Sequence, residues 1–253
     1  MSAINEKLFE NYASTHAGII DGTHQQQQVR ADTRSNLNYP AILPTNKNAK
    51  ILEIGCNKGY FLHWLRSRGY TDLTGVDLSP GDIAAAKEYT MLPELYCIDG
   101  IDFIADKPGA YDVIVFRAVF EHIEKQYSES FLRAVGKAIK PEGKIMIEVP
   151  NMDWFMAHHE RYMDFTHEVG FTRESLGQLL RLLFEKVEIR PVHEGYFSFA
   201  GMIRIKILKP IVKRIMGGMF AIMGEGANDM WWSNRAILAI ASKPKTEIMD
   251  SKS

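Results

Sequence analysis

From residue 50 onward, short and continuously apolar runs alternate with segments whose apolar residues recur at the helical period. Apolar runs of four to eight residues are typical of buried strands, and the longer periodic segments are typical of amphipathic helices. Such alternation predicts a mostly parallel sheet covered by helices on both faces. The predicted strands are Lys50–Ile54, Asp72–Asp77, Leu95–Ile98, Asp112–Phe116, Lys144–Val149 and Val187–Val192, and the predicted helices lie near Lys58–Arg68, Ser79–Tyr89, Tyr127–Ile139 and Thr172–Leu182.

The two ends of the chain extend this α/β pattern. A short helix is predicted at Ile4–Ala13, and the last strand, RAILAIASKP, follows a long irregular stretch, so it can return antiparallel. We predict an N-terminal helical cap over residues 1–44, a core over 45–194, an insertion over 195–230, and the last strand with its tail over 231–253.

Composition narrows the choice of partners. The chain has 253 residues, of which 46% are hydrophobic and 24% charged, and its net charge is −1. This length and composition suit one globular domain with an elaboration. The chain lacks the excess of basic residues that nucleic-acid-binding proteins usually have. The N-terminal segment is charged and has no apolar core, and no run of about 18 uncharged apolar residues occurs. We therefore expect neither a signal peptide nor a membrane span, a cytoplasmic location and no nucleic-acid partner.

One stretch, ILEIGCNKGYF (residues 51–61), joins a buried strand to a helix through a glycine turn. Gly55 and Gly59 accept positive φ and allow a ligand close to the backbone, and Asn57 tolerates the left-handed region better than other side chains. The acid in the strand, Glu53, suits a cationic ligand. The turn lacks the full G-x-G-x-x-G of a dinucleotide site.

Two further acids end the next two predicted strands. Asp77 lies 24 residues after Glu53, where an acid in a doubly wound sheet can accept both hydroxyls of a ribose. Asp99 ends the third strand beside the same crevice. Ser79 and Pro80 supply the cap and first turn of the following helix, which leaves Asp77 available for a ligand.

Together these motifs resemble the class I S-adenosylmethionine-dependent methyltransferases, over about Lys50–Val149 and the last strand. The resemblance implies a doubly wound seven-stranded sheet whose last strand is antiparallel, with S-adenosyl-L-methionine as cofactor and S-adenosyl-L-homocysteine as product. It implies that Glu53 and the turn hold the methionine part, Asp77 the ribose, and Asp99 with Gly100 the adenine. The candidate cofactor-binding residues are Glu53, Gly55, Cys56, Asn57, Gly59, Asp77, Leu78, Asp99, Gly100 and Arg117.

The acceptor is expected to bind beyond the fourth and fifth strands. There the segment RYMDFTHEVGFTRESL, residues 161–176, resembles methyltransferases of bacterial surface-polysaccharide and other sugar pathways, which implies a sugar or glycan hydroxyl as acceptor. The candidate acceptor-binding residues are Glu121, His122, Trp154, Arg161 and Tyr162.

Transfer to a hydroxyl needs a base, for which histidine is suited near neutral pH. We predict His167 as this base. Asp164, three residues earlier, would orient the ring if both lie on one helical turn. His159 is the next candidate, and the alternative is that the Asp164–His167 pair is structural.

Two other functions stay open. Quinone and phenol O-methyltransferases are the nearest competitors, and some carry Glu-x-x-Glu-His and use a divalent metal. Here Ala118 stands in place of the first Glu, so we predict no metal. The third hypothesis is a non-catalytic S-adenosylmethionine-binding module.

The insertion contains IRIKILKPIVKRIM, residues 203–216, in which five basic residues lie among aliphatic ones. A basic amphipathic helix can lie on an anionic membrane surface, here at the inner face of the membrane. The alternative is a lid or a homodimer contact that buries the apolar side.

Overall fold

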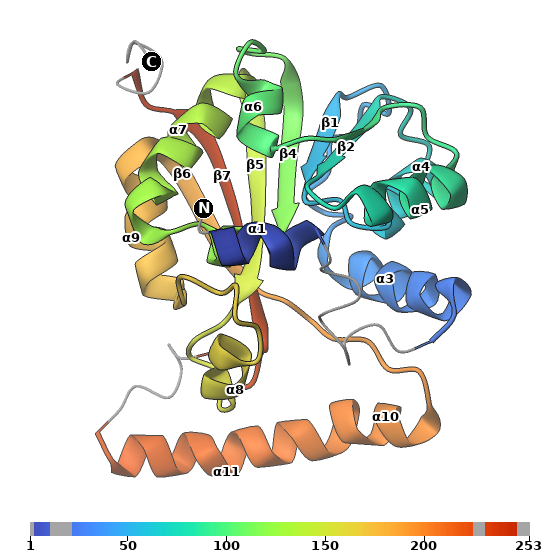
Figure 1. Cartoon of the computed structure of the whole chain (residues 1–253). Helices are drawn as coiled ribbons and strands as arrows, with labels where there is room; N and C mark the ends of the chain where they lie inside the picture. The colour runs from blue at the N-terminus through green and yellow to red at the C-terminus, as the bar shows by residue number, and fades with distance from the viewer. Residues whose placement is uncertain (1–2, 11–21, 225–230, 247–253) are drawn as a thin grey trace.

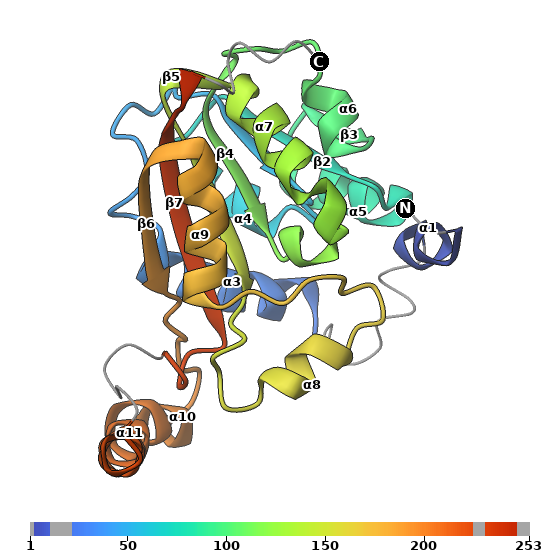
Figure 2. The same cartoon turned by 90° about the vertical axis from the view of Figure 1, so that its left-hand side faces the viewer.

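The computed structural model describes residues 3–10, 22–224 and 231–246. Its centre is one seven-stranded sheet of order β3-β2-β1-β4-β5-β7-β6, with helices on both faces (Figures 1 and 2). All neighbouring strands pair parallel except β7, which is antiparallel to both β5 and β6. The strands are β1 (Ile51–Ile54), β2 (Leu73–Asp77), β3 (Leu95–Cys97), β4 (Tyr111–Arg117), β5 (Ile139–Pro150), β6 (Phe184–Pro191) and β7 (Ala236–Pro244).

The doubly wound fold with an antiparallel last strand is confirmed. The four helices predicted between strands are present, and each begins and ends within two residues of the expected position. The described α-helices are α1 (Ala3–Glu10), α3 (His24–Asn38), α4 (Tyr60–Ser67), α5 (Pro80–Thr90), α6 (Gly100–Ile104), α7 (Ser128–Ala138), α8 (Ala157–Tyr162), α9 (Arg173–Leu183), α10 (Phe199–Ile203) and α11 (Lys209–Ile222). Part of the expected N-terminal helix, residues 11–13, lies outside the described residues.

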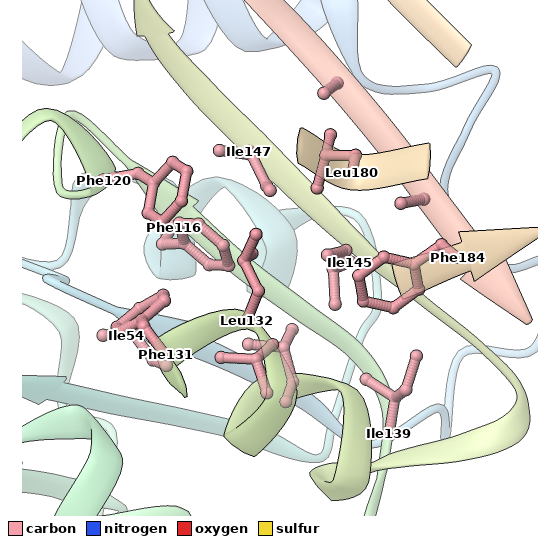
Figure 3. Close-up of a cluster of buried hydrophobic side chains, with 14 of the residues drawn as sticks. Ile54, Phe116, Phe120, Phe131, Leu132, Ile139, Ile145, Ile147, Leu180 and Phe184 are labelled. Atoms are coloured by element: carbon pink, nitrogen blue, oxygen red, sulfur yellow. The ribbon is translucent and has the colours of Figure 1, made fainter. Parts of the chain in front are cut away.

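The sheet buries an apolar layer on each face. On one face Phe116 and Ile145 of the sheet meet Phe131 and Leu132 of α7 and Leu180 of α9 (Figure 3). The opposite face packs under α4 and α5 and includes the fully buried aromatic side chains of Phe61 and Trp64. Burial on both faces explains why the parallel strands are continuously apolar.

Helix α3 fastens the N-terminal part of the chain to the sheet. Thr23 and Gln26 form a capping box at its start. Near its end, the Arg34 guanidinium lies 2.5 Å from Oε1 of Glu148 on β5, and the Tyr39 hydroxyl donates to Oε2 of Glu148 at 2.7 Å. These contacts hold α3 beside the carboxyl ends of the parallel strands. The division of the chain into an N-terminal cap, a core, an insertion and a last strand with its tail stays a prediction.

The insertion between β6 and β7 forms a long helical segment (Figure 1). Helix α10 continues through a π-helical turn at Arg204–Leu208 into α11, and Pro210 stands in the first turn of α11. Proline has no N–H for an interior hydrogen bond, which accounts for the π-helical turn just before Pro210. Within the described residues, no helix is long and apolar enough to cross a membrane.

Candidate active site

A cavity of about 570 Å³ lies at the carboxyl ends of β1, β2 and β4. It spans the point between β1 and β4 where the strand order reverses, which is the usual ligand position in an open α/β sheet. Its volume suits a ligand of drug size. The lining residues are Phe9, Gln27, Arg30, Ile54, Gly55, Asn57, Tyr60, Val76, Asp77, Leu78, Asp82, Ile98, Asp99, Gly100, Ile101, Arg117, Ala118, Val119, Glu121, His122, Ile123, Phe131, Pro150, Glu160, Met163, Asp164 and His167.

The glycine turn has the strained backbone that the sequence predicted. Gly55, Asn57 and Gly59 have φ values of 71°, 47° and 74°. A Cβ atom at Gly55 would lie 2.3 Å from the side chain of Val119, and one at Gly59 would lie 2.7 Å from Thr90. Both glycines are therefore needed for packing as well as for φ, and of the two only Gly55 lines the cavity.

Asp77 stands at the centre of the cofactor half. Its Oδ2 accepts from the backbone N–H of Asn57 at 2.8 Å, and its Oδ1 accepts from that of Ser79 at 2.9 Å. Each carboxylate oxygen has a second lone pair for a ligand hydroxyl. Burial, more than any other cause, raises the pKa of Asp77. The side chain is thus held rigidly at the position expected to bind the ribose.

Asp99 directly precedes the short helix α6 at the edge of the cavity. Its Oδ1 accepts from the backbone N–H groups of Ile101 and Asp102, so it is the N-cap of α6. Beside it, Leu78, Ile98 and Ile101 give this end of the cavity an apolar lining. An apolar slot next to Asp77 is the environment that an adenosine group needs, so the residues fit the cofactor.

Glu53 lies behind the cavity rather than in its lining. Its Oε1 accepts a hydrogen bond from Arg117 Nε at 3.2 Å. Arg117 lines the cavity, whereas Glu53 does not. Burial raises the pKa of Glu53 to about 7, although the Arg117 guanidinium opposes this shift. Cys56 also lies outside the lining. Any contact of Glu53 with the methionine part therefore passes through Arg117 or water.

The other half of the cavity contains an unusual buried carboxyl group. Glu121 is only 2% exposed, and neither of its side-chain oxygens has a hydrogen-bond partner among the described residues. Burial is the largest cause that raises its pKa to about 8; the negative charges of Glu148, Asp164 and Glu160 act in the same direction, and a backbone hydrogen bond opposes them. A buried polar group without a partner is costly and marks a place where a ligand group is expected.

Two imidazole rings lie beside Glu121. His122 and His167 have ring centroids 4.8 Å apart. The Nδ1 of His167 lies 2.9 Å from the carbonyl oxygen of Glu160, so it carries the proton and leaves Nε2 basic. Desolvation by burial lowers the pKa of His167, and the Asp164 charge only partly offsets this effect. His167 is therefore neutral near pH 7 and can accept a proton.

The predicted pairing of Asp164 with His167 is corrected by the structure. Residues 163–167 do not form a helical turn, and the group that holds the His167 ring at Nδ1 is the Glu160 carbonyl rather than Asp164. Asp164 Oδ1 instead accepts from the Thr166 hydroxyl at 2.6 Å, and the His122 Nδ1 lies 2.9 Å from that same hydroxyl oxygen. Because Thr166 gives its hydroxyl proton to Asp164, the His122 Nδ1–H donates to Thr166. Asp164 thus orients His122.

Four residues expected near the acceptor or the reacting atoms do not line the cavity: Trp154, His159, Arg161 and Tyr162. Arg161 donates to the backbone carbonyls of His167 and Glu168, which fastens the loop that carries the proposed base. Trp154 stacks against the guanidinium of Arg235, 5.1 Å from ring to cation. Tyr162 is 75% exposed, and His159 is exposed as well. Thr166, which the sequence analysis did not single out, is the residue that links Asp164 to His122.

One group of side chains in the cavity has the composition of a cation site. Glu121, His122 and His167 each offer one ligand atom, and these atoms lie within 4.8 Å of one another. Two imidazoles and one carboxylate suit a transition metal or zinc. The sequence prediction of no metal did not foresee this group, because His167 comes from a different segment than Glu121 and His122. The absence of a metal from the enzyme stays a prediction, and chelation can test it.

Replacing Glu121 with glutamine is expected to flatten the pH dependence of stability. In the folded protein its pKa is about 8, against the ordinary glutamate value of 4.5, so between these values the folded state retains a proton that the unfolded chain has lost. The free energy of unfolding of the wild type should therefore fall as pH rises through this window, by up to about 1.4 kcal/mol per pH unit from this group. Urea unfolding across the window measures the slope of both proteins.

The control is Glu142→Gln, which removes an exposed carboxyl group and should leave the slope unchanged. A stability difference between Glu121→Gln and wild type that stays constant with pH would contradict a raised pKa at Glu121.

The chain is similar to several known methyltransferases. A model of the methyltransferase domain family matches residues 24–183. The chain is 26% identical over 240 residues to a malonyl-[acyl-carrier protein] O-methyltransferase of Priestia megaterium, across 92% of this chain and 86% of that protein. It is 29% identical over 106 residues to a ubiquinone biosynthesis O-methyltransferase of Chromobacterium violaceum, across 40% of this chain and 44% of that protein.

Solved structures share the fold at low identity. A SAM dependent methyltransferase from Archaeoglobus fulgidus matches with a TM-score of 0.60 and 18% identity, across 94% of this chain and 99% of that one. The DhpI–SAH complex matches with a TM-score of 0.59 and 17% identity, across 96% and 98%. The chain therefore belongs to the methyltransferase domain family, as a class I methyltransferase whose methyl donor is S-adenosylmethionine.

Proposed function

We propose that this enzyme moves the methyl group of S-adenosylmethionine to a neutral hydroxyl that binds between Glu121 and the rings of His122 and His167. The observation that supports this most is the buried Glu121 carboxyl group, whose two oxygens have no partner among the described residues. A hydroxyl both donates and accepts, so it can pair with this group in either protonation state.

A carboxylate acceptor fits this half of the cavity less well. The lining contains two arginines, Arg30 and Arg117, and Arg117 is paired with Glu53. From residue 118 onward, the described lining residues include Glu121, Glu160 and Asp164 but no lysine or arginine, and Glu160 is paired with Arg235 outside the lining. A bound carboxylate would therefore add a negative charge next to Glu121 and Asp164. Malonyl-[acyl-carrier protein] O-methyltransferase, by its name, acts on a malonyl group, and for the present chain these charges favour a neutral hydroxyl over that acceptor.

Among hydroxyl acceptors, we favour a sugar or glycan. Support comes from the resemblance of the segment that contains Asp164 and His167 to surface-polysaccharide methyltransferases. A phenol or quinone precursor is the second candidate, favoured by the similarity to ubiquinone biosynthesis O-methyltransferases and by the adjacent Glu121 and His122. A non-catalytic role would leave these polar groups of the cavity unexplained.

The proposed reaction uses His167 as the base. Bound S-adenosylmethionine supplies a methyl group made electrophilic by its sulfonium. His167, held by the Glu160 carbonyl, would accept the proton of the acceptor hydroxyl at Nε2 as the oxygen bonds to the methyl carbon and the bond from that carbon to sulfur breaks, which leaves S-adenosylhomocysteine. His122, held through Thr166 by Asp164, is placed to orient the same hydroxyl. Glu121 fixes the hydroxyl from the remaining side.

Transfer of radiolabelled methyl to separate acceptor pools tests this proposal. The pools are nucleotide sugars with glycan oligosaccharides, phenols with quinone precursors, and malonyl-acyl carrier protein. We expect label in an ether linkage in the first pool and none in the malonyl ester. Label confined to the phenol pool would favour the second candidate, and label in the malonyl ester would overturn the hydroxyl proposal. That the protein forms a homodimer, and that it lies at the inner face of the membrane, both stay predictions.

A further inference from the structure

Residues 199–222 form a continuous helical segment, here called the α10–α11 rod, that stands apart from the rest of the fold (Figures 1 and 2). None of its residues is buried. At about 1.5 Å per residue its 24 residues extend about 36 Å. It lies beyond the carboxyl ends of the parallel strands, at the same end of the molecule as the cavity (Figure 1).

One face of the rod is apolar and exposed. Ile211, Ile215, Met219 and Ile222 recur at the helical spacing and are 52%, 60%, 50% and 88% exposed. Ile207, Leu208, Val212 and Met223 extend the same surface, each more than half exposed. A contiguous row of large aliphatic side chains in contact with water is unusual for a soluble protein and marks an interaction surface.

The rod is also strongly cationic. It contains no acidic residue, and its five basic residues are Arg204, Lys206, Lys209, Lys213 and Arg214, in a chain whose net charge is −1. At about 100° per residue, Arg214 lies about 60° beyond Ile211 and Lys209 about 60° beyond Val212, on the two sides of the aliphatic face, whereas Lys213 lies opposite this face. Lysine and arginine in these flanking positions can reach past an apolar face to phosphate groups while their stems stay in apolar surroundings.

We propose that the α10–α11 rod lies parallel to a membrane that contains anionic phospholipids, with its aliphatic face among the acyl chains and its cations against the lipid phosphates. A second copy of this chain fits the rod less well, because it would bring five positive charges beside five others with no acid in either rod to pair with them. A bilayer with anionic lipids supplies both the apolar layer and the opposite charge.

Docking in this way would hold the end of the molecule that contains the cavity toward the membrane. This consequence rests on the proposed function, whereas the docking itself does not. It favours an acceptor hydroxyl carried by a lipid-linked molecule over one that is freely dissolved.

Co-sedimentation of the full chain with vesicles tests the docking. We compare vesicles of phosphatidylcholine alone with mixed vesicles that also contain phosphatidylglycerol. Binding is expected on the mixed vesicles and should fall steeply with added salt. Each cation near the surface strengthens partition about fivefold, so the double variant Lys209→Gln, Arg214→Gln should bind about 30-fold more weakly. Ile211→Ser with Ile215→Ser should abolish binding.

The matched control is Lys87→Gln with Lys186→Gln, which removes the same charge at exposed positions outside the rod and should bind as wild type does. Because no rod residue is buried, the variants should keep their thermal stability and their affinity for S-adenosylhomocysteine, which separates a docking failure from a failure of the proposed function. Equal recovery with both vesicle types, or unchanged binding by the rod variants, would overturn the proposal. A dimer in light scattering that only the isoleucine variant dissolves, without vesicle binding, would assign the rod to self-association instead.

Discussion

Replacing His167 with asparagine is expected to slow methyl transfer by about 10²–10⁴ while the affinity for S-adenosylhomocysteine stays near that of the wild type. The ring is held at Nδ1 by the Glu160 carbonyl, and burial keeps it neutral near pH 7, so its Nε2 can receive a proton. Asparagine can retain the contact with the carbonyl but cannot accept the proton. Single-turnover transfer of labelled methyl to the responsive acceptor pool, beside calorimetry with S-adenosylhomocysteine, measures both quantities.

The matched control is His159→Asn, an exposed histidine outside the cavity that should keep full activity. Because the pKa of His167 is lowered from 6.5, the wild-type kcat/KM should rise with pH through a value below 6.5, and the variant should lose this inflection. A folded His167→Asn enzyme with normal turnover would show that the base is a different group, and His122 is then the next to replace.

Treatment with a chelator distinguishes two roles for His167, a general base or a metal ligand. With His167 as a base and no metal, dialysis against a chelator should leave the activity unchanged. Loss of activity that a divalent ion restores would instead assign Glu121, His122 and His167 as its ligands. In that case His167→Asn should also lower the affinity for the ion.

Replacing Asp77 with alanine is expected to weaken the binding of S-adenosylhomocysteine about ten- to a hundred-fold. The change removes charge-assisted hydrogen bonds to the ribose worth roughly 1.5–3 kcal/mol. It also removes the acceptors for the backbone N–H groups of Asn57 and Ser79, which loosens the glycine turn. Calorimetry on the purified variant gives the affinity, and its thermal unfolding shows whether the fold is intact.

Two companion variants locate the source of that loss. Asp77→Asn keeps one acceptor and the shape of the side chain, so its affinity should lie between those of alanine and wild type. Asp72→Ala, at the start of the predicted second strand, removes an acid away from the cavity lining and should bind normally. Wild-type affinity in a folded Asp77→Ala protein would remove the ribose assignment.

The fold could be predicted from the sequence because its signals are local. Apolar runs such as that of β4 are buried on both faces, Ser79 with Pro80 begins α5 as expected, and Asn57 adopts the positive φ that asparagine tolerates. Each of these features depends on a few neighbouring residues. The order of motifs along the chain then placed Gly55 and Asp77 at one cavity.

The acceptor half was harder to predict because its contacts join distant segments through loops. Thr166 lies 44 residues from His122, and only the folded loop brings the hydroxyl and the ring together. The spacing of Asp164 and His167 would be informative on a helix, but residues 163–167 are not helical. Arg161 was expected to bind the acceptor, and the backbone carbonyls of its own loop occupy it instead.

A crystal structure with bound S-adenosylhomocysteine tests the central claim most directly. The adenosine is expected between Asp77 and Asp99, with the sulfur turned toward the cluster of Glu121, His122 and His167, so that a methyl group on that sulfur would face His167 Nε2. A sulfur atom that faces away from this cluster, or a ligand bound outside the cavity, would contradict the account.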